Sequence, residues 1–252
     1  MGACEAPDLH VKTGILLEMT MDDATRNYLE AVPKVELHVH LEGAIRPETI
    51  LEIAKRNRVD LPVKTVEEAR DWFVFRDFYH FNKVYNAITK CLNTSDDYEL
   101  IVSDLGTELA RQNVHYAEVT TSPGSHVDER AFMDGLSRGR RRVMDDHGIE
   151  LNWIFALDRD TRRFAERADY TTRVAIDARP DGVVGIGLGG YNRYGPPEEF
   201  EKWFDLGLAA GLRSVPHAGE FAGPENIWGA IHSLKAERIG HGITAEDLSR
   251  IL

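Results

Sequence analysis

Short apolar runs with strand character alternate with longer amphipathic segments from Val35 to the end of the chain. We expect strands at Val35–His40, Val114–Thr120, Ile149–Leu157, Val183–Leu188, Leu212–His217 and Arg238–His241. Strands that alternate with helices form parallel sheets, because each helix returns the chain to the same edge of the sheet. Units that all run in one direction, each strand ending in a polar cluster, favour an α/β fold of the (β/α)8 TIM-barrel type over a doubly wound open sheet.

The segments between these runs carry apolar residues at helical spacing. We expect helices at Pro47–Arg56, Asp128–Asp146, Thr161–Ala178, Glu198–Ala210 and Pro224–Leu234, and an insertion at about residues 76–112 made of Phe78–Leu92 and Asp96–Arg111. The insertion is longer than a plain crossover and is expected to cover the first strand as a lid or flank. Residues 1–32 are expected to form a tail with a short helix, and residues 33–252 an incomplete barrel domain.

Six β/α units fit between Val35 and Leu252, whereas a closed barrel of this type has eight. We therefore expect the last two units to lie beyond Leu252. Without them the first and sixth strands would be open edges, which promote aggregation. On this basis the chain of residues 1–252 is expected to be inactive alone.

Composition excludes several classes of partner. The 42 acidic residues outnumber the 30 basic ones, and the net charge of −12 repels nucleic acid polymers and anionic membranes. The arginines between Arg138 and Arg142 run on into acidic residues of an expected helix, which is typical of a solvated helix face. The chain has 2 cysteines and no apolar run of membrane-spanning length, so a reducing, cytoplasmic setting is expected. The sequence leaves the oligomeric state open.

Four histidines stand at the carboxyl ends of expected strands. His38 and His40 are two residues apart and therefore face the same side of one strand, which is suitable spacing for two ligands of one metal. His217 and His241 end two later strands. A lone His-x-His is often an ordinary surface pair, but the barrel edge collects functional groups from every strand end, and this favours a site.

Three neutral imidazoles and one open position are typical of a catalytic zinc site. We expect His38, His40 and His217 to be the ligands of one Zn²⁺ per chain. Glu220 lies in the turn after His217 and is a candidate proton donor, and His241 is a candidate to hold or deprotonate the water. An alternative role for Glu220 is that of a carboxylate near the N-terminus of the following helix.

The run Gly185–Gly190 matches the Gly-x-Gly-x-x-Gly pattern of dinucleotide-binding folds. It lies in the fourth unit instead of the first, and Tyr191 to Pro197 separate it from the next helix. We therefore interpret it as a loop where backbone approaches a ligand closely.

Together these motifs resemble the adenosine deaminase branch of the amidohydrolase superfamily. The similarity runs from Pro33 to Leu252, and five segments carry it: Val35–Ala44, Tyr116–Val119, Val183–Gly190, His217–Glu220 and Arg238–Gly242. The resemblance implies a zinc enzyme that replaces the 6-amino group of adenosine or a related adenine nucleoside with oxygen and releases ammonia.

The same resemblance implies roles for single residues. Glu220 protonates the ring nitrogen N1, and His241 orients the attacking water. His40, Glu42 and Gly190 fall where the family contacts its substrate, with Gly190 at the purine and Glu42 near the sugar. Binuclear relatives need a lysine at the end of the fourth strand, and none stands between Val183 and Gly190.

Two departures from the family pattern leave the substrate open. Glu42 stands where adenosine deaminases usually have aspartate, and Tyr191-Asn192 replaces acidic residues. The stretch Gly219–Trp228 is similar to bacterial 6-aminodeoxyfutalosine deaminases, whose substrate is an adenine nucleoside with a bulky 5′ group. Further alternatives are an inactive binding protein that retains the fold, and a two-metal enzyme that cleaves cyclic amides.

Overall fold

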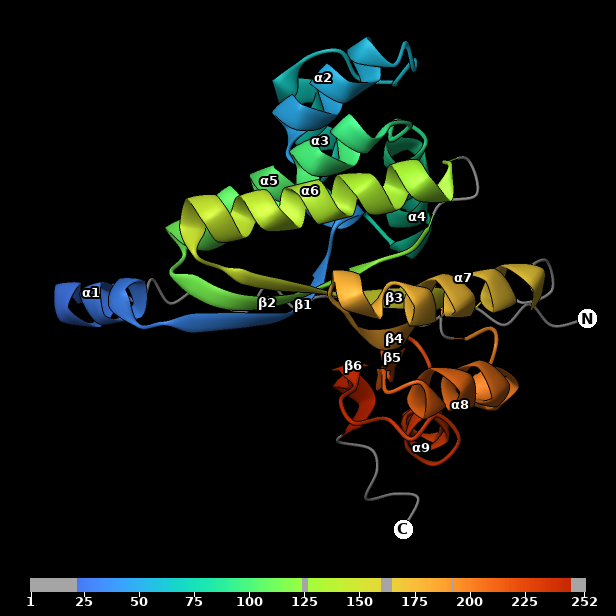
Figure 1. Ribbon diagram of the computed structural model, residues 1–252. Helices are drawn as coiled ribbons and strands as arrows, with labels where there is room; N and C mark the ends of the chain where they lie inside the picture. The colour runs from blue at the N-terminus through green and yellow to red at the C-terminus, as the bar shows by residue number, and fades with distance from the viewer. Residues whose placement is uncertain (1–21, 124–126, 160–164, 192, 246–252) are drawn as a thin grey trace, which may run out of the picture. The chain divides into compact units, whose positions relative to one another are not determined.

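Six parallel strands form the centre of the fold, and they occupy the same order in the sheet as in the chain (Figure 1). The computed structural model describes residues 22–123, 127–159, 165–191 and 193–245. The strands are β1 (Lys34–His40), β2 (Val114–Thr121), β3 (Glu150–Asp158), β4 (Val183–Gly189), β5 (Arg213–Ala218) and β6 (Gly240–His241). Sequential order is that of a β/α barrel, whereas a doubly wound sheet reverses its strand order part-way. The barrel-type fold predicted from the sequence is confirmed.

Helices connect the strands. In the order of the chain they are α2 (Pro47–Arg56), α3 (Val66–Trp72), α4 (Phe78–Thr89), α5 (Ser95–Arg111), α6 (Glu129–His147), α7 (Ala165–Asp177), α8 (Glu201–Ala209) and α9 (Pro224–His232). Short 3-10 turns occupy Glu42–Ala44, Arg179–Asp181 and Pro197–Phe200. Helix α3 was not expected from the sequence, and the expected start of α7 at residues 161–164 lies outside the described residues.

The chain divides into two compact units, residues 1–32 and residues 33–252. In the first unit the described part contains α1 (Asp23–Ala31), whose first turn is capped by the Asp22 carboxylate accepting from the Thr25 N–H at 2.7 Å. The expected tail at residues 1–21 lies outside the described residues. Among the described residues, no helix combines the length and apolar character that a bilayer crossing needs.

The core lies between the sheet and its helices. Strand β3 is buried from Leu151 to Leu157, as expected for the middle of a parallel sheet that is covered on both faces. Helices α5 and α6 lie side by side (Figure 1). Their close approach depends on Gly135, since a Cβ atom there would lie 2.5 Å from the Ser95 carbonyl oxygen.

The arginines of α6 bind to neighbouring elements of the fold. Arg138 pairs with Asp96 at 2.7 Å and with Glu99 at 3.1 Å, both on α5. Arg140 is half-buried, and its Nε donates to the Leu151 carbonyl of β3 at 2.6 Å. The expectation of a solvated helix face is therefore wrong for Arg140, because its side chain turns inward and donates to a buried residue of β3.

Replacing Gly135 by Ala should destabilise the fold. The new Cβ would also lie 2.6 Å from Tyr98 Cβ, so α6 would have to move away from α5. We expect a loss of about 1–3 kcal/mol in the free energy of unfolding, the range for overpacked cores, measured by chemical denaturation. The control Arg141→Ala, at an exposed position of α6, should stay within about 0.5 kcal/mol of the parent. Equal midpoints for the two variants would contradict the close packing of α5 and α6.

Candidate metal centre and active site

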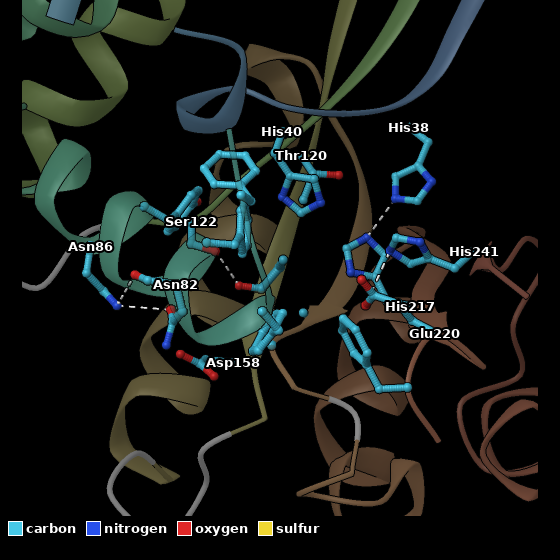
Figure 2. A pocket seen from close by; sticks show the side chains of 18 of the residues that line it. His38, His40, Asn82, Asn86, Thr120, Ser122, Asp158, His217, Glu220 and His241 are labelled. Carbon is cyan, nitrogen blue, oxygen red and sulfur yellow. Dashed lines mark hydrogen bonds and ion pairs between the residues drawn. The ribbon is translucent and has the colours of Figure 1, made fainter. Parts of the chain in front are cut away.

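Three imidazoles from two strands converge on one point. His38 and His40 end β1, and His217 lies one residue before the end of β5. One nitrogen of each ring lies within 4.8 Å of one nitrogen of the others, and the Nε2 atoms of His38 and His217 are 3.1 Å apart. Figure 2 shows these rings on one side of a pocket, with His241 beside them. The structure therefore brings together the three residues predicted as metal ligands.

The environment keeps these imidazoles neutral. Burial, together with the neighbouring imidazoles, lowers the pKa of His217 to about 2 and that of His40 to about 4. Burial also lowers the pKa of His38. Neutral imidazole is the form that coordinates Zn²⁺, and three such donors at a strand edge match a catalytic zinc site with an open position. The donor set therefore fits one zinc ion.

Glu220 lies beside this cluster in the turn after β5. Burial raises the pKa of its carboxyl group to about 7, while the Arg159 guanidinium lowers it. The alternative role at a helix N-terminus is not supported, because α9 begins at Pro224 and its acidic first-turn residue is Glu225. Glu220 therefore holds a proton in a substantial fraction of molecules at neutral pH.

His241 completes the group from the end of β6. Its backbone is left-handed, with φ of 71°, and its Nε2 lies 3.5 Å from Glu220 Oε2. Its ring meets the His38 ring edge-on with centroids 4.7 Å apart. Burial lowers the pKa of His241 to about 4, so the neutral ring is available as a base at pH 7.

A cavity of about 770 Å³ opens beside these residues. The four histidines, Glu220 and Gly190 line it, and α4 with its preceding turn forms another part of its wall. Phe78 and Phe221 also line it, and their rings contact each other and the ring of Tyr191, with Phe78 stacked on Tyr191 at 5.0 Å. The inserted segment predicted to cover the first strand thus contributes directly to the pocket.

The two other predicted substrate contacts have different surroundings. Gly190 lies on the cavity wall with φ of 91°, and a Cβ atom there would come within 2.9 Å of Asp158 Oδ1. Glu42 is only 3% exposed and lines a smaller adjoining cavity of about 250 Å³ instead. Burial raises its pKa, and the hydrogen bond from Thr121 lowers it. Glu42 therefore does not line the large cavity that His40 and Gly190 line.

Some residues of the site were missed from the sequence. Ser122 and Asp158 line the cavity just after β2 and at the end of β3, so the strand-end rule that identified His217 also applied to them. Arg159 is 1% exposed, and its guanidinium donates to the His217 carbonyl at 2.5 Å and to the Gly195 carbonyl at 2.7 Å. Tyr85 lies on the inserted α4, where no sequence signal marked it.

The other histidines of the described residues lie away from the site. His80, His115, His147 and His232 do not line the cavity, and His10 and His126 lie outside the described residues. His80, for example, receives the Arg76 backbone N–H at 3.3 Å next to the start of α4.

Comparison with known proteins identifies the family of the chain. The family model described as adenosine deaminase matches residues 33–252. The chain belongs to the adenosine deaminase family. A similar member of this family is the aminodeoxyfutalosine deaminase of Streptomyces avermitilis, 42% identical over 233 residues, which are 90% of this chain and 64% of that protein. The adenine deaminase of Cupriavidus pinatubonensis is 32% identical over 91% of this chain and 66% of its own.

Solved structures of similar proteins share the fold. Adenine deaminase from Arthrobacter aurescens superposes with a TM-score of 0.78 at 30% identity, covering 86% of this chain and 67% of that chain. An amidohydrolase from Burkholderia ambifaria with bound Zn gives a TM-score of 0.80 at 28% identity, covering 95% and 66%. The chain thus spans about two thirds of the length of these relatives.

Proposed function

We propose that the protein catalyses hydrolytic deamination of an adenine nucleoside and that its preferred substrate is aminodeoxyfutalosine. One observation carries the proposal: a carboxyl group with a pKa of about 7, Glu220, shares a cavity with three converging neutral imidazoles. A proton donor beside a metal site is what replacement of an aromatic amine by water requires. A catalytically inactive protein has no need of this combination.

The residues divide the chemistry among them. His38, His40 and His217 hold one zinc ion, which when bound supplies the Lewis acid that activates water near neutral pH. His241 orients the water and accepts its proton. Glu220 donates a proton to N1 of the purine, so that C6 becomes electrophilic. Water adds to C6, the amino group takes the proton held by His241 and leaves as ammonia, and the proton of the new hydroxyl returns to Glu220. These steps convert the adenine ring to the hypoxanthine ring and restore both residues.

The dimensions of the pocket favour a nucleoside over free adenine. Its volume of about 770 Å³ is in the upper part of the range for drug-sized ligands, which is roughly 300–1,000 Å³, and a purine base alone leaves most of it empty. The cluster of aromatic rings formed by Phe78, Tyr191 and Phe221 is suited to an apolar extension of the sugar. The relative named aminodeoxyfutalosine deaminase is more similar, at 42% identity, than the adenine deaminase at 32%.

Substrate preference tests the proposal. The full-length, zinc-loaded protein should consume aminodeoxyfutalosine with a higher kcat/KM than adenosine, and adenosine with a higher kcat/KM than adenine, because each larger substrate fills more of the pocket. Loss of absorbance at the adenosine maximum measures all three rates. A preference for adenine would show that the protein is a base deaminase, and consumption of none of the three would reject the proposed function.

Zinc binding should depend on His217. The His217→Ala variant loses one of three ligands and should hold zinc at least about 10-fold more weakly, measured by competition with a chromophoric chelator. The matched control His232→Ala lies on an exposed part of α9 and should bind one zinc ion per chain, as the parent does. Retention of zinc by His217→Ala, or two ions in the parent, would contradict the proposed site.

Glu220 should control turnover and its pH dependence. Glu220→Gln keeps the shape but lacks the acidic proton, so we expect at least about a 10²-fold loss of kcat with zinc content unchanged. In the parent, kcat/KM should fall as the pH rises through the Glu220 pKa, because the donor is lost. Burial places that pKa at about 7, and a bound zinc ion lowers it, so the decline should begin at or below pH 7.

The control for this experiment is Glu225→Gln, at an exposed position in the first turn of α9. It should retain the turnover and pH profile of the parent. Full activity in Glu220→Gln would remove Glu220 from the mechanism.

A further inference from the structure

Both oxygens of the Glu42 carboxylate accept hydrogen bonds from side chains of the protein. One receives the Thr121 hydroxyl at 2.6 Å and the other the Tyr85 hydroxyl at 3.1 Å. Glu42 does not line the large cavity, and its carboxylate is bound by these two hydroxyl groups instead.

The turn of the chain after β1 explains the direction in which the Glu42 side chain points. If the strand continued, Glu42 would face the same side as His38 and His40. Instead Leu41 adopts helical angles, with φ of −54° and ψ of −52°, and a 3-10 turn begins at Glu42. The Glu42 side chain consequently points behind the cavity wall, toward Tyr85 of α4 and Thr121 of β2.

Two hydroxyl groups on the wall donate their protons away from the large cavity. Tyr85 and Ser122 both line this cavity and the smaller one beside it. The Tyr85 proton goes to Glu42, and the Ser122 hydroxyl donates to the Ala156 carbonyl at 2.6 Å. A hydroxyl group has one proton and two lone pairs, so each oxygen retains only acceptor capacity. This part of the wall therefore accepts hydrogen bonds from a ligand.

A carboxylate adds to the acceptor character of this wall. Asp158 lines both cavities at the end of β3. Figure 2 shows Ser122 and Asp158 on one side of the pocket, and His38, His217 and His241 on the other. The Cα atoms of Thr120 and His40 are partners across β1 and β2, and Ser122 follows Thr120 by two residues, just after β2 ends. The acceptors and the histidines thus line different parts of one cavity.

We propose that Tyr85, Ser122 and Asp158 form a subsite that accepts hydrogen bonds from the sugar hydroxyls of the substrate, and that Glu42 positions Tyr85 without contacting the substrate. This inference rests on the proposed function, because the purine must bind at the histidine side for its sugar to reach this wall. Sugar hydroxyls are donors in this region of a nucleoside, and a free base has none. The subsite therefore selects nucleosides against adenine.

Product binding tests the subsite without relying on turnover. Inosine and hypoxanthine share the deaminated ring, but only inosine carries the sugar. In the zinc-loaded protein, Ser122→Ala and Tyr85→Phe should each weaken inosine binding by about 3- to 10-fold, the range for one hydrogen bond. Hypoxanthine binding should be unchanged in both. Isothermal titration calorimetry measures the four dissociation constants, and thermal denaturation checks that each variant folds.

Glu42→Gln provides a more specific test of the positioning role. The glutamine amide has only one oxygen, so it can accept from Tyr85 or from Thr121 but not from both. With its NH₂ toward Tyr85, that hydroxyl accepts and turns its own proton toward the cavity. This variant should also weaken inosine binding and leave hypoxanthine binding unchanged, although residue 42 does not touch either ligand. The control Tyr79→Phe removes an exposed α4 hydroxyl that does not line the cavity, and it should match the parent.

The outcomes separate this inference from the proposed function. If the parent binds inosine and deaminates nucleosides but the variants affect inosine and hypoxanthine equally, or affect neither, the subsite is wrong and the proposed function stands. If the parent neither binds these purines nor deaminates a nucleoside, the proposed function fails and the subsite fails with it.

Discussion

Parallel strand ends converge at the site, and the close approach of three imidazoles there constrains the rest of it. Burial is the main cause of the low pKa values of His40 and His217, about 4 and about 2. The neighbouring imidazoles contribute as well, because protonating two of the rings would place like charges a few ångströms apart. The same proximity leaves unprotonated nitrogens directed at one region, which a divalent cation satisfies.

Glycine makes this crowding sterically possible. The Cα atoms of His217 and Gly240 are partners across β5 and β6. A Cβ atom at Gly240 would lie 2.3 Å from His217 Cδ2, so any larger residue would displace the ring. Arg159 holds the backbone of His217 by donating a hydrogen bond to its carbonyl oxygen. The positive charge of Arg159 also lowers the pKa of Glu220, against the effect of burial. The first glycine of the Gly-His-Gly motif leaves room for the His217 ring, and the buried arginine holds the His217 backbone. Both features therefore position the same histidine.

Much of the sheet and of the histidine cluster was predictable, because both follow from local rules. All six strands lie where the apolar runs predicted them, since the tendency to form a strand is a property of short segments. The parallel direction followed from the alternation of strands with helices. The positions of His38, His217 and His241 followed from the shared edge of a parallel sheet. Helix α3 was missed because Val66–Trp72 makes only about two turns, too short for periodicity to stand out from the neighbouring insertion.

The surroundings of Glu42 were not predictable by the same rules. Alternation along a strand predicts which face of the sheet a side chain points to only while the strand continues, and β1 ends at His40. The partners of Glu42 come from 43 and 79 residues away in the chain, so no local pattern indicates them. The resemblance to a family supplied a role for an acidic residue at this position, but the added methylene of glutamate and the turn at Leu41 redirect the carboxylate.

The residues proposed to carry out the reaction and those proposed to select the substrate lie in different parts of the chain. The histidines proposed as metal ligands, and His241, stand at the ends of strands, where packing of the sheet restrains them. Tyr85 and Phe78 belong to α4, an insertion that the barrel itself does not need. Under the proposed function, changes in α4 can therefore alter which purine derivative fits without disturbing the histidine cluster.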